Sequence, residues 1–376
     1  MYLCRLQRYD KRVKNATLAA TFLTPQSHFC PFFNVLKPLP TVKKTLSALV
    51  KYGIPIAISV GLAVFLYNNV DLEAIKTSLR QDVNYWWFAP VIVVSIMSHV
   101  FRALRWKLQL DALGIHAPVH ALICSIFGTY FVNLLFPRLG EVWRCGYIAQ
   151  RQNAPFATVL GSMVGDRLSD TLMVLLLTVG TFFLAQDAFT AFLSQRGDGG
   201  SILATWWFWT AVVLAAALAV VLWRIMRGTG SSPAIVKVRG MLQNLWDGFA
   251  SVWHMEGKWM FLLYTLLIWG CYFMQLYIAS LAFTFTAGLG VVAVLVLFVL
   301  SSIGMAVPSN GGLGPWQFAI IFGLAIYGVG TLPLTTPYNA QASAFAWLVW
   351  GVQTLLLIAL GIYAFAYIAL SKRQQQ

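Results

Sequence analysis

The chain has 376 residues, of which 59% are hydrophobic, 15% aromatic and only 10% charged, and its net charge is +14. Soluble domains average about 25% charged residues, so this composition excludes a soluble fold. The basic balance does not indicate nucleic-acid binding, because Lys and Arg fall in short loops and beside apolar runs, as is typical of membrane proteins.

The first 41 residues differ from the rest of the chain. Residues 1–41 are polar and basic, contain four prolines, and have no apolar run long enough to enter a bilayer. This composition predicts a disordered cytoplasmic extension. We expect a transmembrane domain over residues 42–371, followed by a short tail at 372–376.

Apolar runs fill most of that domain. A helix needs about 20 such residues to cross the hydrocarbon, and the short alternating segments of a membrane β-barrel are not seen. The sequence therefore predicts an all-α, polytopic transmembrane helix bundle with about eight spans. The predicted apolar segments are 52–67, 86–104, 119–136, 168–186, 202–223, 259–284, 288–307, 316–330 and 342–370.

The distribution of Lys and Arg predicts the orientation. The N-terminal region through Lys51 carries nine such residues, the 102–120 loop three, and the 224–258 loop five, whereas 68–85 carries two and 187–201 one. Because basic loops stay in the cytoplasm, we expect the N-terminus and the 102–120 and 224–258 loops on that side.

This orientation requires a broken segment between 119 and 167. Both ends of that stretch must lie in the cytoplasm, yet only 119–136 is strongly apolar. The sequence predicts a re-entrant hairpin that turns near Pro137 and Gly140. Such backbone is tolerated at membrane depth only where protein or a watery cavity satisfies its polar groups.

A second break is predicted at residues 308–315, since no helix continues through three glycines and two prolines in eight residues. Paired breaks in the two halves of a chain indicate a transport site. Whether 316–330 crosses or turns back stays open. The residues of this break are Pro308, Asn310, Gly311, Gly312 and Gly314, with Gln317 just after it.

Ionisable residues cluster around the first break and the start of the next apolar segment. Charge at bilayer depth costs several kcal/mol unless it is paired, so these groups pair with each other or line a polar cavity. As a cavity, the arginines suit lipid phosphate; as ion pairs, they would pin the hairpin to the next helix. The candidates are Arg138, Glu141, Arg144, Asp166, Arg167 and Asp170.

Arg102 and Arg105 have two readings as well: anchors at the end of a span, or part of the same headgroup site. His and Cys show no metal-ligand spacing, so we expect neither a metal nor a cofactor.

These residues carry a family resemblance. The transmembrane, flippase-like domain of lysylphosphatidylglycerol synthases is similar over roughly 45–370. Its motifs match Arg102-x-x-Arg105-Trp106, Asn133-x-x-x-Pro137-Arg138-x-Gly140-Glu141-x-x-Arg144, Asp166-Arg167-x-x-Asp170 and Pro308-x-Asn310-Gly311-Gly312-x-Gly314.

The resemblance adds Asn133 to the candidate headgroup site, and the sequence departs from the family pattern at two positions. Asp166 stands where the family usually has Glu, and Gln317 stands where a Glu is common. No soluble synthase domain follows Leu370, which indicates the stand-alone form.

We therefore expect a lipid flippase or transporter of the bacterial inner membrane, without enzymatic activity, whose partners are membrane lipids. A separately encoded lipid-modifying transferase could cooperate with it. The alternatives are a membrane-embedded transferase acting on lipid-linked substrates and a non-transporting envelope scaffold.

Overall fold

The computed structural model describes residues 61, 72–136, 138–188, 190, 256–307, 309–330 and 340–373. All of them belong to one of two compact units, Leu49–Gln376. The predicted extension at 1–41, the segments 52–67 (except Gly61) and 202–223, and both Pro137 and Pro308 lie outside the described residues. The domain boundaries stay predictions.

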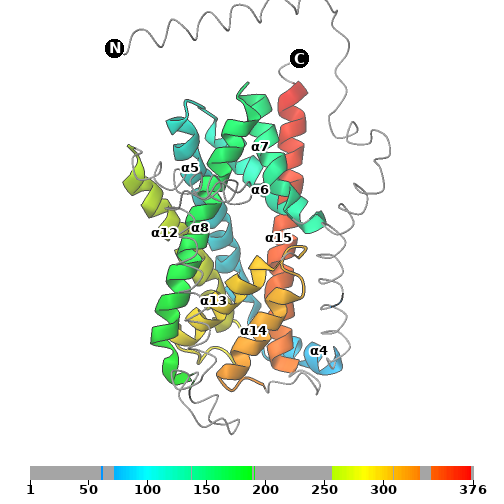
Figure 1. Ribbon diagram of the computed structural model, residues 1–376. Helices are drawn as coiled ribbons and strands as arrows, with labels where there is room; N and C mark the ends of the chain where they lie inside the picture. Colours follow the sequence, from blue (N-terminus) through cyan, green and yellow to red (C-terminus); the bar gives the residue numbers. More distant parts are fainter. Residues whose placement is uncertain are drawn as a thin grey trace, which may run out of the picture. The chain divides into compact units, whose positions relative to one another are not determined.

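Every regular element in the described part of the chain is helical, which confirms the all-α prediction. Four helices are long and apolar enough to cross a membrane, and they run the length of the bundle (Figure 1). They are α5 (Phe88–Ala112), α8 (Phe156–Leu184), α12 (Lys258–Leu281) and α15 (Ala340–Arg373). With the shorter apolar helices they form a multi-pass membrane bundle.

Two of the four long helices extend beyond the predicted spans, α5 at its C-terminal end and α8 at its N-terminal end. The apolar run at 86–104 continues as helix to Ala112, and the run at 168–186 begins as helix already at Phe156. Charged residues interrupt both runs in the sequence, and in the helices these charges form ion pairs, some inside the bundle and one at its surface.

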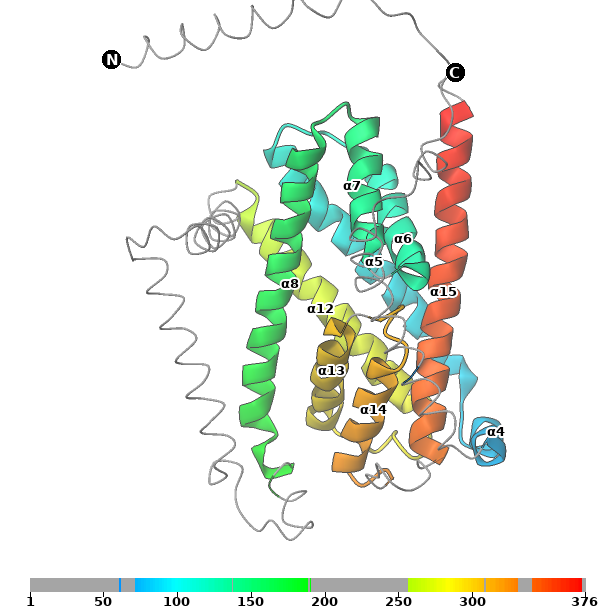
Figure 2. The same cartoon turned by 45° about the vertical axis from the view of Figure 1, so that its right-hand side comes forward.

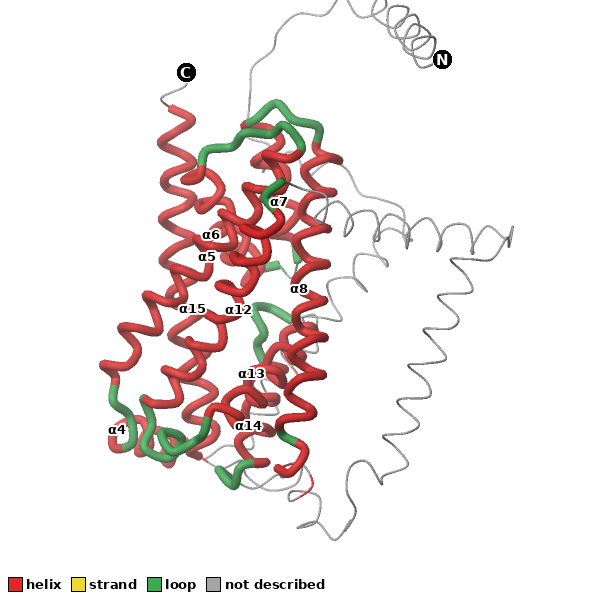
Figure 3. Tube along the Cα trace, turned by 90° about the vertical axis from the view of Figure 1, so that its left-hand side faces the viewer, coloured by secondary structure: helices red, strands yellow, loops and turns green. Residues whose placement is uncertain are grey.

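Four shorter helices form two hairpins: α6 (Val119–Leu135) with the amphipathic α7 (Leu139–Arg151), and α13 (Val291–Ala306) with α14 (Pro315–Ile326). At 1.5 Å per residue they are about 18 to 26 Å long, short of a hydrocarbon core of about 30 Å. The hairpins occupy opposite halves of the bundle (Figure 2). Figure 3 shows loop segments at both ends of the bundle and at mid-height, near the second break.

The first hairpin turns where the sequence predicts it to turn. Phe136 is extended, and Arg138 adopts the left-handed conformation with φ 61°. Gly140 is not part of the turn. It lies in the first turn of α7, where a Cβ would overlap the carbonyl oxygen of Thr129 on α6. Glycine is needed at 140 because the two helix backbones approach so closely.

The second hairpin settles whether 316–330 crosses or turns back. Helix α14 packs along α13 rather than continuing across, so 288–307 and 316–330 together enter and leave on one side. Consequently α15 starts on the side where α13 starts and ends on the side where α5 ends (Figure 1). Whichever side holds the 113–118 loop therefore also holds Arg373.

Two large apolar cores and a third, small cluster between α6 and α15 hold the described helices together. The larger core joins the first part of α5 with α12, α13, α14 and α15, and the smaller one joins the second part of α5 with α6, α7 and the start of α8. Along α5 the boundary falls between Val91 and Ala103, and along α8 between Met163 and Met173.

Helix α6 also packs along α15. Phe131 fills the space above Gly361, where any Cβ would collide with its ring, and the ring nitrogen Nε2 of His120 lies 2.8 Å from the Tyr363 hydroxyl. At the other end of α15, helix α4 (Leu72–Gln81) packs against the bundle.

Candidate functional site

A layer of ion pairs lies between the two cores, formed first by α5 and α8. Arg102 and Arg105 are three residues apart on α5, and Asp166 and Asp170 are four apart on α8, so each pair shares one helix face. Arg105 donates to the Asp166 carboxylate at 2.7 and 2.9 Å and to Asp170 at 2.8 Å. Arg102 donates to Asp170 at 2.8 Å, and its Nη1 lies 3.5 Å from Asp166.

This geometry excludes the anchor reading of Arg102 and Arg105. Both side chains are buried, 3% and 0% exposed, in mid-helix rather than at the end of a span. Two of the three basic residues counted for the 102–120 loop therefore lie inside the bundle, and the predicted orientation rests mainly on the other basic regions. A cytoplasmic N-terminus stays a prediction.

Helix α7 adds a third guanidinium from the re-entrant hairpin. Arg144 is fully buried, and its Nη2 lies 3.4 Å from an oxygen of Asp166. The guanidinium carbon sits 4.3 Å from the centre of the Trp106 ring, a favourable cation–π distance. Within the described residues, Nε and Nη1 of Arg144 have no hydrogen-bond partner.

Glu141, Arg167 and Asn133 form the partly exposed rim of this layer. Arg167 Nη2 lies 3.3 Å from Glu141, and its Nη1 lies 3.8 Å from Asp170. The side chain of Arg167 is 37% exposed and that of Glu141 is 16% exposed. Asn133 donates to Glu141 at 3.2 Å and accepts from the Gly140 amide at 2.8 Å, which fixes the hairpin to the rim.

Hydroxyl groups that were not predicted from the sequence complete the layer. Arg102 donates to the Tyr272 hydroxyl at 3.2 and 3.3 Å, and the Tyr130 hydroxyl lies 3.3 Å from that of Tyr272. Arg105 donates to Thr265 at 3.2 Å. Tyrosines in apolar helices commonly lie at the membrane interface. Tyr272 instead lies well inside α12, and this position in the apolar run could have indicated a buried polar partner.

We call the seven Arg, Asp and Glu residues of this layer and its rim the charge cluster. Four guanidinium groups face three carboxylates, so the cluster carries one excess positive charge if all are ionised. Such groups cost several kcal/mol in hydrocarbon unless paired, which explains why they gather from three helices. The members are Arg102, Arg105, Glu141, Arg144, Asp166, Arg167 and Asp170.

Arg138 lies apart from the charge cluster, at the tip of the first hairpin. Its side chain is exposed, and its Nη2 donates at 3.1 Å to the carbonyl oxygen of Ala306, the last residue of α13. The tips of the two hairpins thus meet through this bond. Leu134 adds an apolar contact, because its Cδ2 fills the space beside Gly311.

The second break is built on backbone that only glycine adopts readily. Gly311, Gly312 and Gly314 have φ values of 59°, 81° and 90°. The Trp350 indole donates at 2.9 Å to the Gly311 carbonyl oxygen, which ties the turn to α15. The break therefore contacts the first hairpin and α15.

Gln317 has a structural role in this break. It is fully buried, and its side-chain oxygen accepts the Gly314 amide at 2.7 Å, closing the first turn of α14. Gln317→Ala is expected to lower the free energy of unfolding by about 1–3 kcal/mol, because a buried N–H loses its acceptor. Thermal unfolding in detergent measures this, with the exposed Gln150→Ala as control; equal melting temperatures would contradict the capping role.

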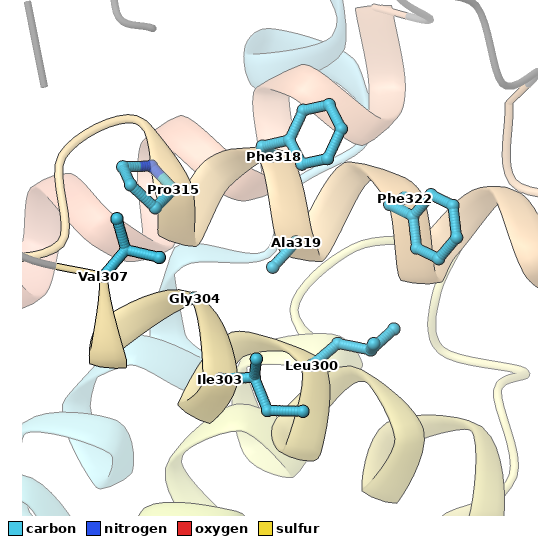
Figure 4. A pocket seen from close by; sticks show the side chains of 8 residues that line it. All are labelled: Leu300, Ile303, Gly304, Val307, Pro315, Phe318, Ala319 and Phe322. Carbon is cyan, nitrogen blue, oxygen red and sulfur yellow. The ribbon is translucent and has the colours of Figure 1, made fainter. Parts of the chain in front are cut away.

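An apolar groove lies beside the second break, between α13 and α14 (Figure 4). Its volume is ≈ 410 Å³, and all eight lining residues are apolar. Val307 and Pro315 lie at one end, and Leu300 and Phe322 at the other.

Comparison with known proteins identifies a family. A family model described as the lysylphosphatidylglycerol synthase TM region matches residues 53–361. A UPF0104 membrane protein of Methanocaldococcus jannaschii is 25% identical over 121 residues, covering 31% of this chain and 35% of that protein. The chain thus matches about a third of the length of that relative. No solved structure matches significantly.

Proposed function

Because the chain belongs to the lysylphosphatidylglycerol synthase transmembrane family, we propose that it transports a polar-headed lipid, a phospholipid or glycolipid, across the membrane. The observation that supports this most is the charge cluster. It lies between two apolar cores, and its two most exposed members, Glu141 on the hairpin helix α7 and Arg167 on α8, contact each other.

In this proposal the rim admits the headgroup. In the described part of the chain Arg167 makes two ion pairs, at 3.3 Å to Glu141 and at 3.8 Å to Asp170. A guanidinium binds phosphate through paired hydrogen bonds, so a phosphate can replace the carboxylate partners of Arg167. Asp166 and Asp170 keep Arg102 and Arg105 in place while this exchange occurs.

The proposal carries further expectations. The membrane is the bacterial inner membrane, the N-terminus is cytoplasmic, and the protein has no enzymatic activity of its own. Its partners are membrane lipids, together with a lipid-modifying transferase encoded elsewhere.

The direct test is lipid translocation in reconstituted vesicles. A phospholipid with a fluorescent headgroup is incorporated, and an impermeant quencher reports its arrival on the outer leaflet. Arg167→Gln is expected to slow translocation about tenfold or more, because the paired charge-assisted hydrogen bonds to phosphate are lost. Arg151→Gln, at the end of α7 and hydrogen-bonded to Tyr147, is the matched control and keeps the wild-type rate.

Wild-type protein that moves lipid no faster than protein-free vesicles would overturn the proposal. The burial of Arg105, Arg144 and Asp166, each 0% exposed, favours a second candidate, in which the charge cluster is a structural ion-pair network of an envelope scaffold. In that case vesicles show no translocation, while substitutions in the cluster still lower stability.

A further inference from the structure

The two helices that line the groove, α13 and α14, approach each other closely at Gly304. A Cβ on Gly304 would lie 2.8 Å from the carbonyl oxygen of Pro315 and 3.2 Å from the Ala319 methyl. The two backbones therefore touch at this point, and the larger side chains on either side stand apart. The groove follows α13 from Leu300 to Val307, about 10 Å at 1.5 Å per residue.

The groove faces outward, where the bilayer would lie. Ile303 and Val307, both in its lining, are 46% and 36% exposed. An apolar groove that opens toward hydrocarbon suits an extended acyl chain.

A cation stands at one end of the groove. Arg138 donates to the carbonyl oxygen of Ala306, the residue before Val307, so its guanidinium is anchored next to Val307, which lines one end of the groove. In the described part of the chain no carboxylate forms an ion pair with Arg138. The anchoring bond uses one of its five N–H donors and offsets the negative carboxyl end of α13.

We propose that the groove seats one acyl chain of the transported lipid while Arg138 binds the phosphate of its anionic phosphodiester headgroup. The match of charge favours this occupant, because a bare apolar surface would accept any acyl chain, whereas a guanidinium at its end selects a lipid with phosphate at the glycerol. This inference rests on the proposed function and names a lipid site outside the charge cluster.

Photo-crosslinking of the full-length protein in vesicles tests the site. The probe is phosphatidylglycerol with a diazirine on one acyl chain, and mass spectrometry maps the labelled peptides. Labelling is expected to concentrate on 300–322, above that on Leu175, Leu176 and Val179, exposed residues of α8. A diacylglycerol with the same chain but no phosphate is expected to label 300–322 about tenfold less, since it lacks the charge-assisted hydrogen bonds.

Two variants distinguish the acyl groove from the cation. Ile303→Trp fills the groove and is expected to reduce labelling about tenfold by removing apolar contact; Val292→Trp, on an exposed site of the same helix outside the groove, is expected to leave it unchanged. Arg138→Gln is expected to bring phosphatidylglycerol labelling down to the diacylglycerol level.

Labelling of 300–322 that ignores headgroup and Arg138, or that does not exceed labelling of α8, would overturn the inference. The translocation assay separates this result from failure of the proposed function. If the wild-type protein translocates lipid but the groove is not labelled, only the groove site is refuted. If the groove is labelled but no lipid is translocated, transport is refuted and the groove remains a lipid-binding site.

Discussion

Asp166→Asn is expected to lower the free energy of unfolding by about 3–5 kcal/mol, the cost of leaving a buried charge without its partner. Asp166 is fully buried and contacts three guanidinium groups, those of Arg102, Arg105 and Arg144. The amide keeps the shape of the side chain but removes its charge, so the excess positive charge of the cluster rises from one to two. Thermal and denaturant unfolding in detergent measure the loss.

Two further variants show whether the effect comes from charge at this site. Asp166→Glu keeps the charge and is expected to retain most of the stability. Asp111→Asn removes an acidic residue from the end of the same helix as Arg105, where it contacts Lys107 and His116 at the surface; its expected effect is within about 1 kcal/mol. Comparable melting temperatures for Asp166→Asn and Asp111→Asn would show that the buried pairs contribute little.

Gly140→Ala is expected to be the second most damaging change, because the added methyl group would collide with the main chain of α6. The nearest atoms are the Thr129 carbonyl oxygen and, at 2.8 Å, the Asn133 side-chain oxygen that accepts the Gly140 amide. Since backbone cannot rotate away, the hairpin must open, as in an overpacked core, at a cost of about 1–3 kcal/mol or more. Arg144, four residues on, would shift with it, so translocation should fall as well.

Gly146→Ala supplies the control on the same helix. A Cβ there meets no atom within 4 Å, and alanine favours a helix by about 1 kcal/mol over glycine. Gly146→Ala is therefore expected to be neutral or stabilising. If both variants unfold at the same temperature, the close approach of α6 and α7 is not what requires glycine at 140.

The sequence predicted both breaks, the second from a local signal and the first from the number of membrane crossings. Three glycines at 311, 312 and 314 cannot continue a helix, and an apolar run that ends at Phe136 with the next span starting on the same side must turn back. The break near 137 was predicted because residues 119–167 must cross the membrane an even number of times, and the break at 308–315 because glycine and proline interrupt a helix. Neither prediction required knowledge of which helices pack together.

The membership of the charge cluster was harder to predict, because pairing depends on tertiary packing. Arg102 looked equally suited to a span end, since a sequence does not show that Asp170, on another helix, lies 2.8 Å away. Conversely, Arg138 looked like a member of the cluster through its spacing to Glu141, but the left-handed turn at Arg138 directs its side chain to Ala306 instead. The resemblance placed these residues in one set, from which the structure separates Arg138; their role in binding a headgroup stays a prediction.

The packing of α6 against α15 bears on how the protein is made. Neither helix of the first hairpin has enough apolar length to hold a position in the bilayer alone, and Phe131 and His120 on α6 rest on Gly361 and Tyr363. During synthesis the ribosome has to finish residues 340–373 before that surface is covered. Until then the nascent hairpin depends on other support, so interrupted translation upstream of residue 340 is expected to yield a product that membrane proteases clear.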